Sequence, residues 1–200
     1  MWSFVAKKQK NCHPDDPADD HKGDWWDFVA YDAEHRLVVA VVPGARSIEN
    51  AEEIVREVHD RTGGRADVLL TSDELPAYET AIGHVYGVPE PSQPSGGPGR
   101  PAVMPGRRVP AELKYATVHK ERQGGRVVAI FTAVVMGTWA AVAGALERSN
   151  ASRTINTSFL ERQHLTDRHH NARKSRKSVP VSASNQQGAS PCRGVLALRN

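Results

Sequence analysis

The fold is decided by residues 25–44, which read WWDFVAYDAEHRLVVAVVPG. Aromatic and β-branched residues dominate two runs, 25–32 and 36–42, and the short segment AEH separates them. Runs of this composition on either side of a turn are typical of two adjacent strands. A Pro-Gly pair ends the second run, because proline cannot donate a hydrogen bond to a strand ladder.

The sequence on either side extends this hairpin into a larger sheet. Upstream, residues 2–8 read as another strand, so three successive strands form a meander. Downstream, Ser47 can cap a helix, and apolar residues recur every three to four positions until Thr62. The run ADVLL at 66–70 is short and unbroken, which predicts a strand buried on both faces of the sheet.

The second half of the chain begins with a further helix and then a break. Residues 88–110 hold seven of the thirteen prolines, which is typical of a flexible linker. Strands are expected at 115–122 and 126–137, around a Gly-Gly turn, followed by an alanine-rich helix over 138–149. A loop and one long polar helix are expected within 153–177.

Three antiparallel strands, a crossover helix and a parallel strand make a mixed sheet with helices on its faces. We therefore predict an α/β fold whose order of elements is that of a ribonuclease-H-like domain. Other α/β folds share parts of this order and stay open as alternatives. The domain is expected to occupy 1–87 and 111–177, with the linker 88–110 between its parts and a disordered tail over 178–200.

Composition narrows the class of protein. The 200 residues are 39% hydrophobic and 24% charged, as in soluble globular proteins. No run approaches the roughly 18 apolar residues of a membrane span, and no secretion signal is recognisable. Cys12 and Cys192 lie near opposite ends, so we expect no disulfide framework and a cytoplasmic location.

Basic residues gather near one end of the sequence. The stretch 162–177 contains the single acid Asp167 and these basic residues: Arg162, Arg168, Arg173, Lys174, Arg176 and Lys177. Such a stretch favours a polyanionic partner, DNA in particular. A solvated helix face or a disordered tail is the alternative explanation.

Asp73 follows the predicted buried strand. Ligands bind at the carboxyl ends of strands in open α/β sheets, and a carboxylate there can hold a hard divalent cation. The structural alternative is that Asp73 or Ser72 caps the helix beginning at Glu74.

Glu161 is the second candidate acid. It lies in the string NTSFLERQHLTDR, where Ser158 and Glu161 have the spacing of a capping box. Arg168 follows seven residues later, two helical turns on and on nearly the same side. A glutamate among positive groups can form a structural ion pair, or it can ligate a metal beside cations placed for phosphates.

Five strings, taken in order, resemble the insertion-sequence transposases of the DDE superfamily, in particular the small IS-one type. They are WSFVAKKQKN (2–11), GDWWDFVAYDAEHRLVVAVVPG (23–44), TSDELPAYETAI (71–82), YATVHKERQGGRVV (115–128) and RTINTSFLERQHLTDRHHNARKSRK (153–177). The resemblance covers residues 1 to about 177.

The resemblance implies a ribonuclease-H-like fold and metal-dependent DNA strand cleavage and transfer. Three carboxylates would gather two divalent ions, Mg²⁺ or Mn²⁺; the second matches Asp73 and the third matches Glu161. Arg168 matches a basic residue thought to hold DNA ends. The implied partners are DNA, as element ends and as target, and a second copy of the chain in a homodimer.

The chain departs from this family at both ends. The first acid of the family belongs to an Asp-Glu pair directly ahead of the position of Met1, so we expect this chain to lack it and to be inactive. The residues after 177 also differ from the family's aromatic, helical close. The alternatives are a non-catalytic DNA-binding remnant and a related nuclease of the same fold.

Overall fold

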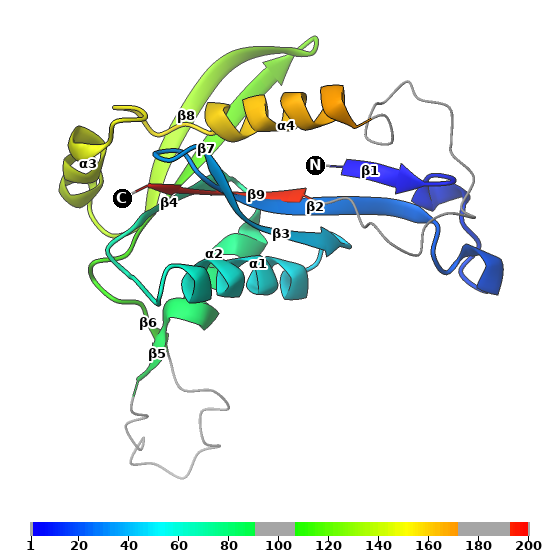
Figure 1. Cartoon of the computed structure of the whole chain (residues 1–200), viewed down its shortest axis with the longest axis horizontal. Coiled ribbons are helices and arrows are strands. Elements are labelled where there is room, and N and C mark those ends of the chain that lie inside the picture. Colours follow the sequence, from blue (N-terminus) through cyan, green and yellow to red (C-terminus); the bar gives the residue numbers. More distant parts are fainter. Residues whose placement is uncertain (1, 91–106, 172–192, 200) are drawn as a thin grey trace.

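The computed structural model describes residues 2–90, 107–171 and 193–199 (Figure 1). Its main feature is a seven-stranded mixed sheet with helices on both faces. The predicted α/β class and mixed sheet are therefore confirmed. No helix in these ranges is long and apolar enough to cross a membrane.

The predicted meander forms the first part of the sheet. Strand β1 (Trp2–Val5) pairs antiparallel with β2 (Gly23–Asp32), which pairs antiparallel with β3 (Leu37–Gly44). Two short 3₁₀ turns, Gln9–Asn11 and Pro17–Asp19, lie in the connection between β1 and β2.

The next helix and strand form as predicted, with a shift of the strand. Helix α1 (Ile48–Arg61) begins after Ser47, whose Oγ accepts a hydrogen bond from the Asn50 backbone N–H. Strand β4 (Leu69–Asp73) lies three residues later than the predicted 66–70, so it includes Asp73 as its last residue. Its residues 69–72 are all buried, as expected for an inner strand.

The remaining elements also lie close to their predicted positions. Helix α2 (Pro76–Tyr86) follows β4, and β7 (Lys114–Gln123) and β8 (Arg126–Met136) form the second hairpin. Gly124 and Gly125 turn this hairpin with positive φ angles, a conformation that glycine adopts without strain. Helices α3 (Trp139–Arg148) and α4 (Ser158–His170) complete the second half.

The predicted linker begins and ends in a small ribbon. Strands β5 (Val88–Pro89) and β6 (Arg107–Arg108) pair antiparallel. Residues 91–106 lie outside the described residues.

The C-terminal segment differs from the prediction. Residues 178–192 lie outside the described part, but Arg193–Arg199 form strand β9 instead of a disordered tail. This strand lies between β2 and β4 in the sheet, parallel to β2 and antiparallel to β4 (Figure 1). The segment forms a strand because β2 and β4 supply backbone hydrogen-bond partners that no isolated segment has.

Apolar side chains fill both faces of the sheet. Helices α1 and α2 cover one face, where Phe28, Leu70 and Tyr115 belong to the main core. Helices α3 and α4 lie on the other face: α3 packs on Leu69 and Val118, and α4 inserts Leu160 (Figure 1). This second face carries the candidate site.

Candidate functional site

Asp73 lies at the carboxyl end of β4, between the buried strand and the loop to α2. Part of its side chain is open to solvent, but the surrounding protein removes much of the water from the carboxylate. This desolvation raises the pKa of Asp73, the nearby Arg46 opposes the rise, and the negative charge of Glu161 adds to it. Glu161 of α4 is thus near enough to Asp73 for its negative charge to act on this carboxyl group.

The helix-cap explanation for Asp73 and Ser72 is wrong. Helix α2 begins at Pro76, its N-cap residue is Leu75, and no side chain accepts a capping hydrogen bond there. Asp73 contributes only its backbone carbonyl, which accepts from the Leu75 N–H at 2.8 Å. Its carboxylate therefore does not cap α2.

A buried hydrogen bond fixes the backbone at this end of β4. The hydroxyls of Ser72 and Tyr115 lie 2.8 Å apart, and Ser72 Oγ donates to the Asp73 carbonyl at 2.6 Å. Burial raises the pKa of Tyr115 to about 12, so its hydroxyl stays protonated and can donate to Ser72. The bond joins β4 to β7 directly behind Asp73.

Glu161 lies in the first turn of α4. Thr157 Oγ1 donates to Glu161 Oε1 at 2.9 Å, and Lys120 Nζ forms an ion pair with the same oxygen. The capping-box prediction is wrong, because Thr157 and not Ser158 is the N-cap residue and no side-chain cap bond forms. Ser158 Oγ instead donates to Asn156 Oδ1 at 2.7 Å.

Lys120 joins β7 to the start of α4. Its Nζ lies 3.2 Å from Thr157 Oγ1 in addition to its ion pair with Glu161. The Lys120 side chain is only 21% exposed, whereas that of Glu161 is 53% exposed. The ammonium group therefore contacts the carboxylate from the protein side, and the carboxylate remains partly exposed to solvent.

The sequence analysis did not identify Lys120, Thr157 or Arg46 as part of this site. A signal for Lys120 existed, because strand alternation from the apolar Ala116 and Val118 places it on the same face of β7. No sequence signal indicated that this face would meet α4.

Packing brings α4 to this position. Leu160, which precedes Glu161, is fully buried against Val29, Tyr31 and Ala33 of the first hairpin. This contact fixes α4 over the sheet and delivers Glu161 toward the end of β4.

The two acids fit a hard divalent cation as a partial site. Carboxylate oxygens are the ligands that Mg²⁺ and Mn²⁺ prefer, and a cation would relieve the repulsion between Asp73 and Glu161. In the part of the chain that the structure describes, no group of three His, Cys, Asp or Glu residues is arranged to hold a metal. The described residues thus offer two candidate carboxylates, Asp73 and Glu161.

The predicted DNA-binding residues are only partly described. Arg162 is exposed on α4, and Arg168 is half-buried near the end of the same helix. The other four lie outside the described residues: Arg173, Lys174, Arg176 and Lys177.

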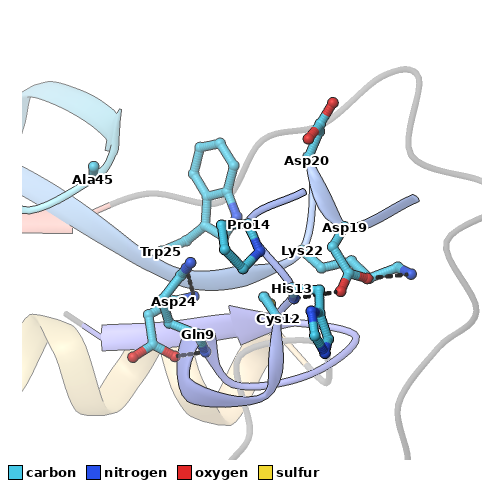
Figure 2. A pocket seen from close by; sticks show the side chains of 10 residues that line it. All are labelled: Gln9, Cys12, His13, Pro14, Asp19, Asp20, Lys22, Asp24, Trp25 and Ala45. Atoms are coloured by element: carbon cyan, nitrogen blue, oxygen red, sulfur yellow. Dashed lines mark hydrogen bonds and ion pairs between the residues drawn. The ribbon is translucent and has the colours of Figure 1, made fainter. Parts of the chain in front are cut away.

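A separate cavity of about 340 Å³ lies in the β1–β2 connection (Figure 2). Its polar wall includes Asp19, whose carboxylate accepts from the His13 backbone N–H and from the Lys22 ammonium, each at 2.9 Å. Lys7 Nζ lies 2.5 Å from Asp19 Oδ2, the oxygen that also accepts from His13. These contacts lower the pKa of Asp19. The buried carboxylate thus has a structural role, because it holds the parts of this loop together.

No family model matches this chain, and neither the curated proteins nor the solved structures contain a match to it.

Proposed function

We propose that this chain is a transposase catalytic domain of the DDE superfamily with a ribonuclease-H-like fold. The observation that carries the proposal is that Asp73, at the carboxyl end of β4, lies where the negative charge of Glu161 on α4 contributes to raising its pKa. The resemblance of the five sequence strings points to the same two acids. A chance pair of acids on separate elements would not be expected to meet at the carboxyl end of an inner strand.

In this proposal Asp73 and Glu161 bind a divalent cation, Mg²⁺ or Mn²⁺, next to a DNA phosphodiester. When bound, such ions activate the attacking oxygen and stabilise the leaving one. Arg162 and Arg168 would contact the DNA backbone, giving affinity that falls with salt. A homodimer that joins two DNA ends remains a prediction.

The pairing of β1 with β2 indicates where an Asp-Glu pair directly ahead of Met1 would lie. Trp2 lies opposite Trp26, so a strand continuing β1 upstream would place its second added residue opposite Val29. In the pairing of β2 with β9, Val29 lies opposite Val195. Extending the pairing of β9 with β4 by two residues places Val195 opposite Asp73. The resemblance predicts the aspartate of the Asp-Glu pair at that position.

The test is Mn²⁺ binding to the 200-residue chain, measured by calorimetry. We expect weak binding that Asp73→Asn and Glu161→Gln each reduce at least about fivefold, because each removes one anionic ligand. Glu121→Gln, an exposed acid on β7, serves as the control and should leave binding unchanged. Equal Mn²⁺ affinity in all four proteins would favour the alternative of a non-catalytic DNA-binding remnant.

Activity supplies a second test. We expect the 200-residue chain to perform no strand transfer with Mg²⁺, because two acids assemble a two-ion site poorly. A chain preceded by Asp-Glu should gain cleavage of DNA ends. Cleavage of RNA–DNA hybrids in preference to DNA ends would instead indicate the related nuclease.

A further inference from the structure

Lys120 is a cation placed inside the candidate metal site. Its Nζ contacts Glu161 Oε1 and Thr157 Oγ1, and most of its side chain is buried between β7 and α4. Among the described residues, both contacts of the Glu161 carboxylate fall on Oε1, so none of them bonds Oε2. The proposed ligand thus already carries a resident ammonium group, whose positive charge opposes a divalent cation at the same carboxylate.

The Lys120 ammonium offsets negative charge in the candidate site. The negative charge of Glu161 acts on Asp73, from whose carboxylate the protein removes part of the water, and this is unfavourable without a positive charge nearby. Arg46 supplies one such charge near Asp73, and Lys120 supplies the other at Glu161. A divalent cation bound by both carboxylates would supply the same compensation from a single point.

We infer that Lys120 is the resident counter-ion of the Asp73–Glu161 pair and that a divalent cation displaces its ammonium from Glu161. The inference rests on the proposed function, since it assigns a residue to the same site. In the absence of metal, Lys120 keeps Glu161 in place beside Asp73. After metal binds, Thr157 still accepts from the ammonium, and the freed donors of Lys120 can turn to a phosphate oxygen.

The alternative is an ordinary ion pair that only fastens α4 to β7. The two explanations predict opposite effects of removing the lysine charge. A competing counter-ion lowers metal affinity, so its removal should strengthen binding. A fastening ion pair positions Glu161, so its removal should weaken binding or leave it unchanged.

The experiment measures Mn²⁺ affinity of the full 200-residue chain by calorimetry, with Lys120→Met as the test variant. Methionine keeps the apolar stem between β7 and α4 and removes the charge. We expect Mn²⁺ to bind about two- to fivefold more tightly, which corresponds to losing one partly exposed ion pair. Lys120→Arg keeps the charge and should stay within about twofold of the unchanged protein.

Arg122→Met is the matched control. Arg122 lies two residues further along β7 and is exposed, and the described ion pair of Glu161 is with Lys120 instead, so Arg122 tests the effect of net charge alone. A similar increase in Mn²⁺ affinity in Arg122→Met and Lys120→Met would overturn the inference, because the change in net charge would then explain both.

A spectroscopic measurement adds a readout independent of affinity. With lysine side chains labelled at ¹³Cε, the resonance that Lys120→Arg removes should shift during a Mg²⁺ titration, with the midpoint of metal binding. A Lys120 resonance that does not move while Mg²⁺ binds would overturn the displacement.

The outcomes separate this inference from the proposed function. If Asp73→Asn and Glu161→Gln weaken Mn²⁺ binding but Lys120→Met fails to tighten it, the counter-ion role is refuted and the metal site stands. If neither acid variant changes Mn²⁺ binding, the metal site itself is refuted and the counter-ion role falls with it.

Discussion

At the residue scale, the candidate site depends on hydroxyl groups that fix its two acids. Ser72 and Tyr115 hold the backbone behind Asp73, and Thr157 holds the carboxylate of Glu161. Each acid is therefore positioned by a side chain from another element or from the residue before its helix. In the proposed metal site, such supporting hydrogen bonds restrict each carboxylate to one orientation before a metal binds.

The Ser72–Tyr115 bond should be measurable in stability. Tyr115→Phe removes one buried hydroxyl from this pair, and we expect it to lower the free energy of unfolding by about 1 kcal/mol. Urea unfolding of Tyr115→Phe, Ser72→Ala and the double variant checks this as a double-mutant cycle. A coupling energy near zero would show that the two hydroxyls do not stabilise each other.

The loop before β2 should depend on pH through Asp19. Its folded pKa lies below the usual value because Lys7, the His13 backbone N–H and Lys22 stabilise the charged form. A lowered folded pKa contributes stability above the unfolded pKa, which is about 3.9, and this stability is lost as the pH falls through the folded value.

We therefore expect Asp19→Asn to be less stable than the unchanged protein at pH 7 and the difference to shrink below about pH 4. Thermal unfolding from pH 7 to pH 2.5 measures it. Asp15→Asn, an exposed acid of the same loop, is the control. A stability difference that stays constant down to the lowest pH would contradict the assignment.

At the element scale, α4 is held by the fully buried Leu160, beside which the partly buried Phe159 packs, and it carries one of the two candidate acids. Leu160 is fully buried, whereas Leu165 on the same helix is 56% exposed. The first residue fixes where the helix lies, and the next residue in the chain, Glu161, reaches the site. Stability and metal binding should therefore change together when the anchor is lost.

Leu160→Ala should lower the free energy of unfolding by about 2–5 kcal/mol, the usual cost of removing a buried leucine side chain. It should also weaken Mn²⁺ binding, because Glu161 is no longer held over β4. Leu165→Ala is the matched control and should change both quantities little. Full Mn²⁺ affinity in a folded Leu160→Ala protein would contradict the role of this anchor.

At the scale of the whole molecule, β9 completes the sheet from the far end of the chain. β1 and β9 lie one after the other along the same edge of β2: β1 pairs with residues 23–26 and β9 with residues within 27–32. β9 also bridges from β2 to β4. A strand that continued β1 upstream would pair with residues 27–32 of β2, where β9 lies.

Deleting residues 193–200 should therefore expose the facing edges of β2 and β4. We expect faster amide hydrogen exchange within 27–32 and 69–71, because these residues lose ladder partners. The β7–β8 hairpin should keep its protection, since it does not contact β9 in the ladder. Unchanged exchange in β2 and β4 would show that β9 does not occupy this place in solution.

The sequence by itself determined the local elements of this protein. The period of apolar residues and the chemistry of Ser47, Gly124 and Gly125 are enough to place α1 and the second hairpin, because a helix or a turn is encoded within a few residues. The buried character of β4 likewise placed Asp73 at its carboxyl end, within three residues.

Only the tertiary structure decided which distant groups meet. The ion pair of Lys120 with Glu161 joins β7 to α4, and β9 enters the sheet between β2 and β4. Local periodicity states which face of an element is buried but not which element covers it. Backbone hydrogen bonds in a ladder are also nearly independent of side-chain identity, so the partner of a strand is chosen by the whole sheet and not by the strand's own residues.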